Sequence, residues 1–182
     1  MSVWGKKRNV IKHYDAVAKI YDLQYGREQR MKMEFALKNL HLKSKSLVLD
    51  VGCGTGILFK YLLDKVEILV GIDISKNILK KAKEKLEGVD NVFLIQADAD
   101  HLPFPNEVFD AIFAITLLQN MPSPITTLKE IERVAKSGAP ILVTGLKKSF
   151  RFKDFKMMLK DFLLEKVWNL EELKDYVALL RS

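Results

Sequence analysis

The stretch Val48-Leu-Asp-Val-Gly-Cys-Gly-Thr-Gly56 decides the fold of this chain. Its first half continues the apolar run from Ser46 and has the length of a short strand buried on both faces. Three glycines follow at alternate positions, where a turn takes positive φ or a ligand touches bare backbone. A buried strand that runs into such a loop indicates a ligand site of the nucleotide-binding type in an α/β protein.

The spacing of the glycines narrows the kind of ligand. A phosphate-binding P-loop needs Gly-x-x-x-x-Gly-Lys, which the chain lacks. A dinucleotide fingerprint places its third glycine one position later, where this chain has Ile57. Asp50, just before the glycines, would repel a pyrophosphate. The order Asp-x-Gly-x-Gly-x-Gly therefore favours a cationic ligand, such as one that carries an ammonium and a sulfonium.

Outward from the loop, strands and helices alternate. A second apolar run over 66–74 ends at Asp73, a carboxylate placed to accept both hydroxyls of a ribose. Further strands are predicted over 92–97, 109–115 and 140–144, and helices over 57–64, 75–86 (with Ser75 as N-cap) and 123–135. Such alternation implies a parallel sheet with its ligand beyond the carboxyl ends of the strands.

The two ends of the chain carry other patterns. Apolar spacing predicts helix over 10–39, divided in two by Gly26. After the core, the patterns favour a helix over 152–164 and a last strand over 174–181, with 165–168 as an antiparallel partner, although a helix fits the same residues. We therefore expect a three-layer Rossmann-like sheet, mostly parallel, with an antiparallel C-terminal strand.

The length of 182 residues fits one domain. We expect residues 1–182 to form it, with a helical lid over 1–40, a ligand-binding core over 46–145 and a C-terminal helix and hairpin over 150–182. The composition, 48% hydrophobic and 29% charged, is that of a globular protein, and no apolar run is long enough to cross a membrane. One cysteine and three scattered histidines predict no disulfide and no metal site, and they favour a reducing, cytoplasmic location.

At these motifs the sequence resembles the class I S-adenosylmethionine-dependent methyltransferases, in the broad group that includes quinone-biosynthesis C-methyltransferases. The resemblance covers about residues 14–144. The matching positions, in chain order, are Tyr14-Asp15, Ala18, Tyr21-Asp22, Asp50 to Gly56, Asp73, Asp98-Ala99, the run Leu102-Pro-Phe-Pro105 and Phe109-Asp110.

This resemblance implies S-adenosyl-L-methionine as cofactor and a role for each matching residue. The methionine end would meet the backbone of Gly52 and Gly54, the carboxylate of Asp50 and the ring of Tyr21. The ribose would be held by Asp73. The adenine would lie against Ile74, Asp98 and the Ala99 amide, and Thr116 and Leu117 would border the reacting methyl. Because the donor is already activated, no catalytic residue is assigned.

The methyl acceptor is left open by the sequence. The net charge of +7, the cluster Lys6-Lys-Arg8 and the segment 147–156, with five basic residues and three phenylalanines, slightly favour RNA or a translation component. The same segment fits an amphipathic helix with buried phenylalanines, or a membrane surface. Family resemblance favours a small, quinone-like or lipophilic acceptor instead, and a third alternative is a non-catalytic S-adenosylmethionine-binding module.

The segment after the fourth predicted strand argues against one class of methyl acceptor, because it lacks a motif. It has no Asn/Asp-Pro-Pro-Tyr/Phe motif, which usually binds the exocyclic amines of nucleic-acid bases that are to be methylated. Gln119 and Asn120 lie there and either bind the acceptor or cap the next helix. By analogy with small translation-linked methyltransferases, an activator subunit is one candidate partner.

Overall fold

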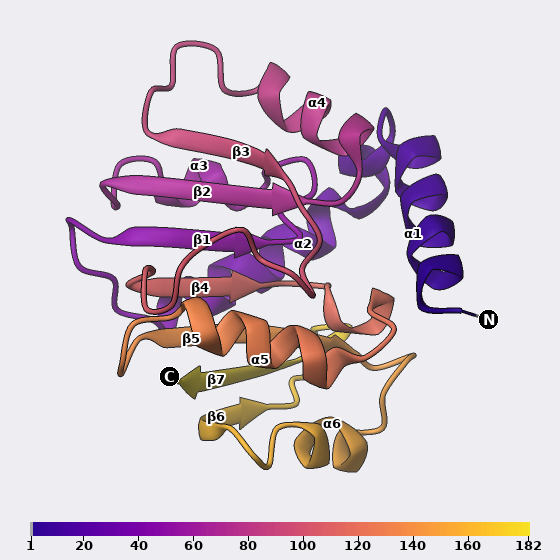
Figure 1. Ribbon diagram of the computed structural model, residues 1–182, viewed down its shortest axis with the longest axis vertical. Helices are drawn as coiled ribbons and strands as arrows, with labels where there is room; N and C mark the ends of the chain where they lie inside the picture. The colour runs from indigo at the N-terminus through magenta and orange to yellow at the C-terminus, as the bar shows by residue number, and fades with distance from the viewer. Residues whose placement is uncertain (1) are drawn as a thin grey trace.

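The computed structural model describes residues 2–182 and shows a seven-stranded sheet with helices on both faces (Figure 1). The strands are β1 (Leu47–Val51), β2 (Ile68–Asp73), β3 (Val92–Gln96), β4 (Ala111–Ala114), β5 (Pro140–Leu146), β6 (Leu163–Trp168) and β7 (Asp175–Arg181). The helices are α1 (Val3–Val17), α2 (Tyr21–Lys38), α3 (Phe59–Leu62), α4 (Lys76–Glu84), the 3-10 turn η1 (Leu118–Asn120), α5 (Pro124–Val134) and α6 (Phe152–Met158).

The strand order is β3-β2-β1-β4-β5-β7-β6. Strands β1 to β5 pair in parallel, whereas β7 runs antiparallel to both β5 and β6. The expected fold class is confirmed, including the antiparallel C-terminal hairpin. The chain turns to opposite sides of β1 after β1 and after β3, so a crevice opens at the carboxyl ends of β1 and β4. Helix α1 lies across this edge of the sheet (Figure 1).

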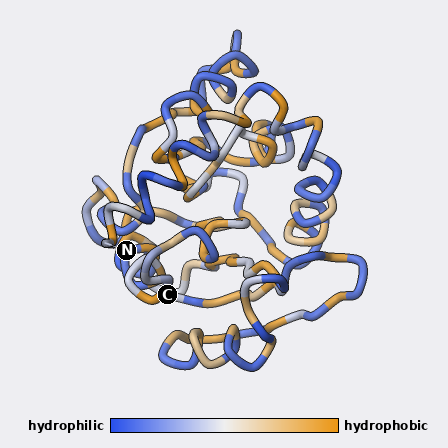
Figure 2. The backbone as a smooth tube through the Cα atoms, turned by 90° about the vertical axis from the view of Figure 1, so that its right-hand side faces the viewer, coloured by the Kyte–Doolittle hydropathy of each residue, from blue (hydrophilic) through white to orange (hydrophobic). Residues whose placement is uncertain are grey.

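Two layers of apolar side chains hold the helices to the sheet. One face packs against α2, α3 and α4, through residues such as Met33, Phe59 and Leu79. The other face packs against α5 and α6, through residues such as Ile131 and Phe155. Hydrophobic and hydrophilic residues alternate along the outer helices in Figure 2, as expected for helices with one face on a sheet.

The predicted break at Gly26 is wrong, because α2 continues through this residue and the break lies at residues 18–20. A glycine inside a helix costs only about 1 kcal/mol, which the buried face of α2 outweighs. The predicted helix over 152–164 is too long, since α6 ends at Met158 and β6 begins at Leu163. Pairing of β6 with β7 satisfies the backbone of these residues better than a further helical turn would.

The sheet contains two positions where only glycine fits, Gly71 in β2 and Gly145 in β5, where a Cβ atom would lie 2.5 Å from the ring of Phe155. A Cβ atom at Gly71 in β2 would lie 2.6 Å from Cζ of Phe59 and 3.0 Å from Sγ of Cys53. Both neighbours are buried, so neither side chain can move aside freely. We expect Gly71→Ala to lower the free energy of unfolding by about 1–3 kcal/mol, measured by urea denaturation.

The matched control is Gly26→Ala, where the nearest atom to a new Cβ is Nη1 of Arg30 at 3.4 Å. This change should raise the free energy of unfolding by about 0.5–1 kcal/mol, because alanine favours the helix. Equal effects of the two substitutions would contradict this account of the packing.

Candidate functional site

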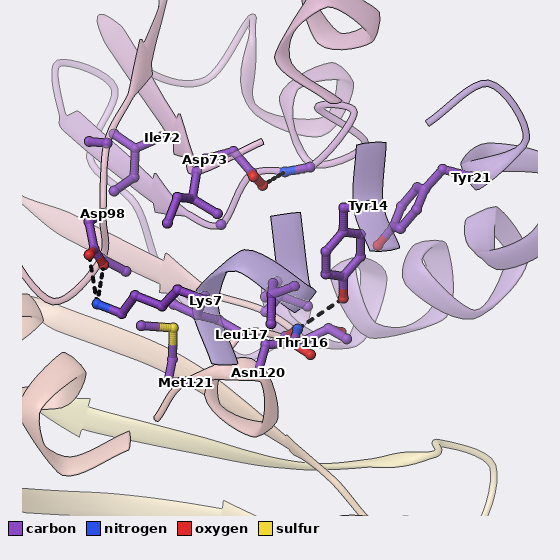
Figure 3. A pocket seen from close by; sticks show the side chains of 17 residues that line it. Lys7, Tyr14, Tyr21, Ile72, Asp73, Asp98, Thr116, Leu117, Asn120 and Met121 are labelled. Atoms are coloured by element: carbon purple, nitrogen blue, oxygen red, sulfur yellow. Dashed lines mark hydrogen bonds and ion pairs between the residues drawn. The ribbon is translucent and has the colours of Figure 1, made fainter. Parts of the chain in front are cut away.

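A pocket opens at the carboxyl ends of β1, β2 and β4, beneath α1 (Figure 3). Eight of the nine residues predicted to contact the cofactor line it: Tyr21, Gly52, Gly54, Asp73, Ile74, Asp98, Ala99 and Thr116. The ninth, Asp50, lines a smaller adjoining pocket together with Tyr21, Gly52 and Gly54. The fold thus brings all nine to one place, and their roles toward a ligand stay predictions.

The glycine loop approaches the pocket through its backbone. Gly52, Gly54 and Gly56 all have positive φ, at 75°, 56° and 73°. The amides of Gly52 and Cys53 both donate to the carbonyl of Ile72 at 2.8 Å, which fastens the loop to the end of β2. A Cβ atom at Gly52 would lie 3.0 Å from the side chain of Leu117. The absence of side chains at these positions leaves room for a ligand to meet bare backbone.

Asp73 joins the glycine loop to the start of α4. Its carboxylate accepts hydrogen bonds from the amide of Gly54 at 3.0 Å and from the amide of Ser75 at 2.9 Å. Ser75 in turn caps α4, as predicted, since its hydroxyl accepts from the amide of Ile78. Burial raises the pKa of Asp73, while the amide hydrogen bonds oppose this shift. The carboxylate also faces the pocket, where it can accept from a diol.

Asp50 is a buried carboxylate that fits a cationic ligand. It is 2% exposed, and the charge that acts on it within the protein is that of another carboxylate, Asp73. Burial and then the charge of Asp73 raise the pKa of Asp50 to about 8. A buried acid of this kind is stabilised in its charged form when a positive group comes beside it. An ammonium and a sulfonium, the cationic groups of S-adenosylmethionine, suit this environment.

Lys7 lies in the pocket, and the sequence reasoning missed it. Its ammonium is 2.6 Å from Asp98 and 2.6 Å from Asp100, and the residue is only 5% exposed. Burial acts to lower the pKa of Lys7, but hydrogen bonds to Asp100 and Asp98 outweigh it and raise the pKa. The sequence places Lys7 in a basic surface cluster. In the structure its charge is instead neutralised inside the protein by Asp98 and Asp100. The signal for its role lies in Asp98 and Asp100, which are remote in the chain.

In both Tyr-Asp pairs of the N-terminal helices, the aspartate bonds to a loop and the tyrosine lines the pocket. Asp15 accepts hydrogen bonds from Ser75, at 2.5 Å from its hydroxyl, and Asp22 accepts from the hydroxyl of Thr55. Tyr14 and Tyr21, which precede them, line the pocket, with ring centroids 6.1 Å apart. Each aspartate therefore anchors an N-terminal helix to a loop at the strand ends, and each tyrosine lines the pocket.

The segment directly after β4 forms another wall of the pocket. Thr116 has a φ of 61°, and its carbonyl accepts from the amide groups of Gln119 at 2.6 Å and Asn120 at 3.1 Å. Asn120 also donates to the hydroxyl of Tyr14 at 2.9 Å (Figure 3). Leu117 and Met121 supply apolar lining. Neither Gln119 nor Asn120 caps α5, which begins after Ser123, so both serve the loop at the pocket.

The aromatic residues of the basic segment 147–156 point inward. Phe155 is fully buried, and Phe150 and Phe152 are half-buried against the core. Phe152 and Phe155 pack on the ring of Tyr176, with centroids 5.1 and 5.6 Å away. These rings are thus not presented for stacking on bases, and of the basic residues Lys147 donates to the carbonyl of Leu170 while the other four are exposed.

Two further features bear on the chemistry. Within residues 2–182, no group of three or more His, Cys, Asp and Glu side chains is placed to hold a metal ion. None of the helices in the same range is long and apolar enough to span a bilayer.

Comparison with known proteins agrees with the site. Residues 49–143 match the family model described as "Methyltransferase domain". A demethylmenaquinone methyltransferase of Bacillus licheniformis is 30% identical over 167 residues, which cover 89% of this chain and 71% of that protein. A demethylmenaquinone methyltransferase of Staphylococcus saprophyticus is 32% identical over 138 residues, and the chain spans 58% of its length.

Solved structures show the same fold. A SAM-dependent methyltransferase from Aquifex aeolicus superposes with a TM-score of 0.71 and 25% identity, covering 82% of this chain and 88% of that one. A methyltransferase of Haloferax volcanii, solved with the methyltransferase activator Trm112, has a TM-score of 0.76 at 16% identity and covers 92% of this chain and 96% of that one. At that identity the second likeness concerns the fold alone.

The region matched by the methyltransferase family model holds the glycine loop, Asp73 and Asp98, and the 30% identical relative extends the likeness to 89% of the chain. The chain belongs to the class I S-adenosylmethionine-dependent methyltransferases, in the group that includes quinone C-methyltransferases, and its cofactor is S-adenosyl-L-methionine.

Proposed function

We propose that this methyltransferase acts on a small, lipophilic, quinone-like acceptor in its reduced, hydroxyaromatic form. The observation that carries this proposal is the 30% identity, over 89% of the chain, with a protein named demethylmenaquinone methyltransferase. The pocket supports it, because Val10, Leu117 and Met121 give its lining apolar side chains. The sequence slightly favours RNA as acceptor; the phenylalanines of segment 147–156, which pack against the core, and the inward-facing Lys7 weaken that case.

The residues of the donor half would act as follows. S-adenosylmethionine supplies a methyl group made electrophilic by its sulfonium. Asp50 and Tyr21 would hold the cationic methionine end, with the backbone of Gly52 and Gly54 beside it. Asp73 would accept from the ribose hydroxyls.

The adenine end would involve Ile74, Asp98 and Ala99. Asp98 is now bound by Lys7, so its predicted part in adenine binding requires Lys7 to share it or to shift onto Asp100, which is equally close. The lid would exclude water, which strengthens each electrostatic contact in the site.

Other expectations remain proposals. Residues 1–40 would serve as lid, 46–145 as cofactor core and 150–182 as C-terminal support, although Met1 lies outside the described residues. A cytoplasmic location and an activator subunit are likewise proposed only, the latter from the fold of the Haloferax volcanii complex.

The first prediction concerns Asp73. Asp73→Ala should weaken S-adenosylmethionine binding at least tenfold, about 1.4 kcal/mol, because the ribose loses its acceptor. Isothermal titration measures the change, and the unfolding midpoint checks that the loop survives. Asp161→Ala, at an exposed position outside the pocket, is the control and should bind as the natural chain does. Unchanged affinity of the folded Asp73 variant would disprove the ribose assignment.

The second prediction concerns proton release. The free carboxyl of Asp50, with its pKa raised to about 8, is mostly protonated at pH 7. A cation beside it lowers that pKa, so binding of S-adenosylmethionine at pH 7 should release roughly half to one proton. Titrations in buffers of different ionisation enthalpy measure the release, and Asp50→Asn should remove most of it. The same release from both proteins would overturn the assignment.

The linked stability change has a fixed sign. Because the folded pKa of Asp50 lies above its usual 3.8, the stability of the ligand-free protein should fall as the pH rises from about 4 to about 8. Asp50→Asn should show a smaller fall in its urea midpoint over that range.

The third prediction tests the acceptor. With S-adenosylmethionine labelled in its methyl group, label should enter a short-chain demethylmenaquinol in detergent micelles and extract into organic solvent. The hydroquinone ring is electron-rich and accepts an electrophilic methyl group, so the oxidised quinone should stay unlabelled. Total RNA is the competing substrate. Label in RNA, with activity that drops steeply as salt rises, would favour the RNA acceptor instead.

A further inference from the structure

A fully buried ion pair lies behind the pocket wall. Nζ of Lys32, in α2, is 2.8 Å from Oδ1 of Asp175, the first residue of β7, and their side chains are 1% and 0% exposed. Buried ion pairs add little stability, because the loss of hydration offsets the attraction between the charges. The pair therefore calls for an explanation other than stability, and its neighbours supply one.

Both members of the pair hold Thr116, the residue at the pocket wall after β4. Nζ of Lys32 donates to the hydroxyl of Thr116 at 3.0 Å. Asp175 accepts from the hydroxyl of Thr144 at 2.8 Å, and that hydroxyl accepts from the amide of Thr116 at 2.8 Å. The ion pair thus fixes the side chain of Thr116 directly and its backbone through Thr144.

Thr116 needs this support because its backbone is strained. Its φ of 61° lies in the left-handed region, which β-branched residues avoid. Among residues 2–182, the other non-glycine residue with positive φ is Glu107, which is exposed. Strain of this kind persists where the surroundings hold a residue on several sides, and it gathers at functional sites.

As a donor, the hydroxyl of Thr116 makes only long hydrogen bonds within the protein. Its Oγ1 accepts from Lys32 at 3.0 Å and from the Nε2 of Gln29 at 3.2 Å, which takes both lone pairs. The protein acceptors nearest to its proton, Oε1 of Gln29 and Oδ2 of Asp175, both lie at 3.4 Å. Oδ2 of Asp175 already accepts from Thr144 at a shorter distance. A ligand oxygen in the pocket would be a better partner for the proton.

We propose that Lys32, paired with Asp175, is a positioning residue that holds and polarises the Thr116 hydroxyl so that it donates to an oxygen of the methyl acceptor. The choice of an oxygen-bearing ring as acceptor rests on the proposed function; the control of Thr116 by the pair does not. A cation bonded to Oγ1 makes this hydroxyl a stronger donor. Acceptors with a hydroxyl or oxyanion next to the methylated atom are the class that this donor selects.

The test removes both charges together. Lys32→Met alone leaves a buried, unpaired carboxylate and confuses folding with function. The double variant K32M/D175L should unfold at a midpoint close to that of the natural chain and bind S-adenosylmethionine with a Kd within threefold. Its kcat with demethylmenaquinol should fall at least 30-fold. If the pair has no part in the reaction, the folded double variant keeps its kcat within threefold, and that result would overturn the proposal.

Thr116 variants decide the question even if the double variant does not fold. Thr116→Val keeps the shape and removes the hydroxyl, and it should lose kcat at least 30-fold. Thr116→Ser keeps the hydroxyl and should retain a third or more. Combining T116V with K32M/D175L should cost no more than threefold beyond either, because both remove one interaction. Full activity of T116V would overturn the proposal.

The matched control is the exposed ion pair between Arg181 and Glu165, 2.7 Å apart in the C-terminal hairpin. R181M/E165L removes the same charges far from the pocket and should leave kcat unchanged.

A structural readout is independent of the acceptor. In a crystal structure of K32M/D175L, Thr116 should leave the left-handed region or turn its hydroxyl out of place. An unchanged φ and side chain would overturn the proposal. If the natural chain does not methylate demethylmenaquinol, the proposed function fails, and this crystal structure still decides the role of Lys32.

Discussion

The hydrogen bonds of Asp73 are the constraint on which the rest of the site depends. Its two carboxylate oxygens hold the amides of Gly54 and Ser75, so the loops after β1 and β2 are set relative to each other. Ser75 extends the connection to two helices, because its hydroxyl caps α4 and also donates to Asp15 of α1. One side chain thus connects the glycine loop with α4 and, through Ser75, with α1. Its position at the end of β2 follows from the parallel pairing of β2 with β1 and β3.

The donor half of the site follows from the sequence because it is built from short segments. Each segment comes directly after a strand, and parallel strands bring their carboxyl ends to one edge. The conformations involved are those that the residue types demand, such as positive φ at Gly52 and a hydroxyl cap at Ser75. Local rules and the global fold agree at these positions, so the strands, the loop and the acidic residues could be predicted.

The parts that sequence reasoning missed depend on contacts between remote segments. Lys7 looks like a surface lysine until α1 places it beside Asp98 and Asp100. Lys32 and Asp175 meet only because α2 packs behind β7. Gly26 was taken for a break because a glycine weakens an isolated helix, whereas α2 is held by its packing on the sheet. Such errors arise where tertiary contacts outweigh local preference.

The same distinction explains why the acceptor is harder to identify than the donor. The proposed cofactor contacts are backbone amides and aspartates whose positions the fold fixes. The proposed acceptor side combines Thr116 after β4 with Gln29 and Lys32 of α2 and with residues of β5 and β7. Its chemistry depends on side-chain identities in four separate elements, and none of them forms a motif alone. The strained backbone of Thr116 is where these elements converge, and a left-handed threonine is tolerated there because charged and polar groups hold it from several sides.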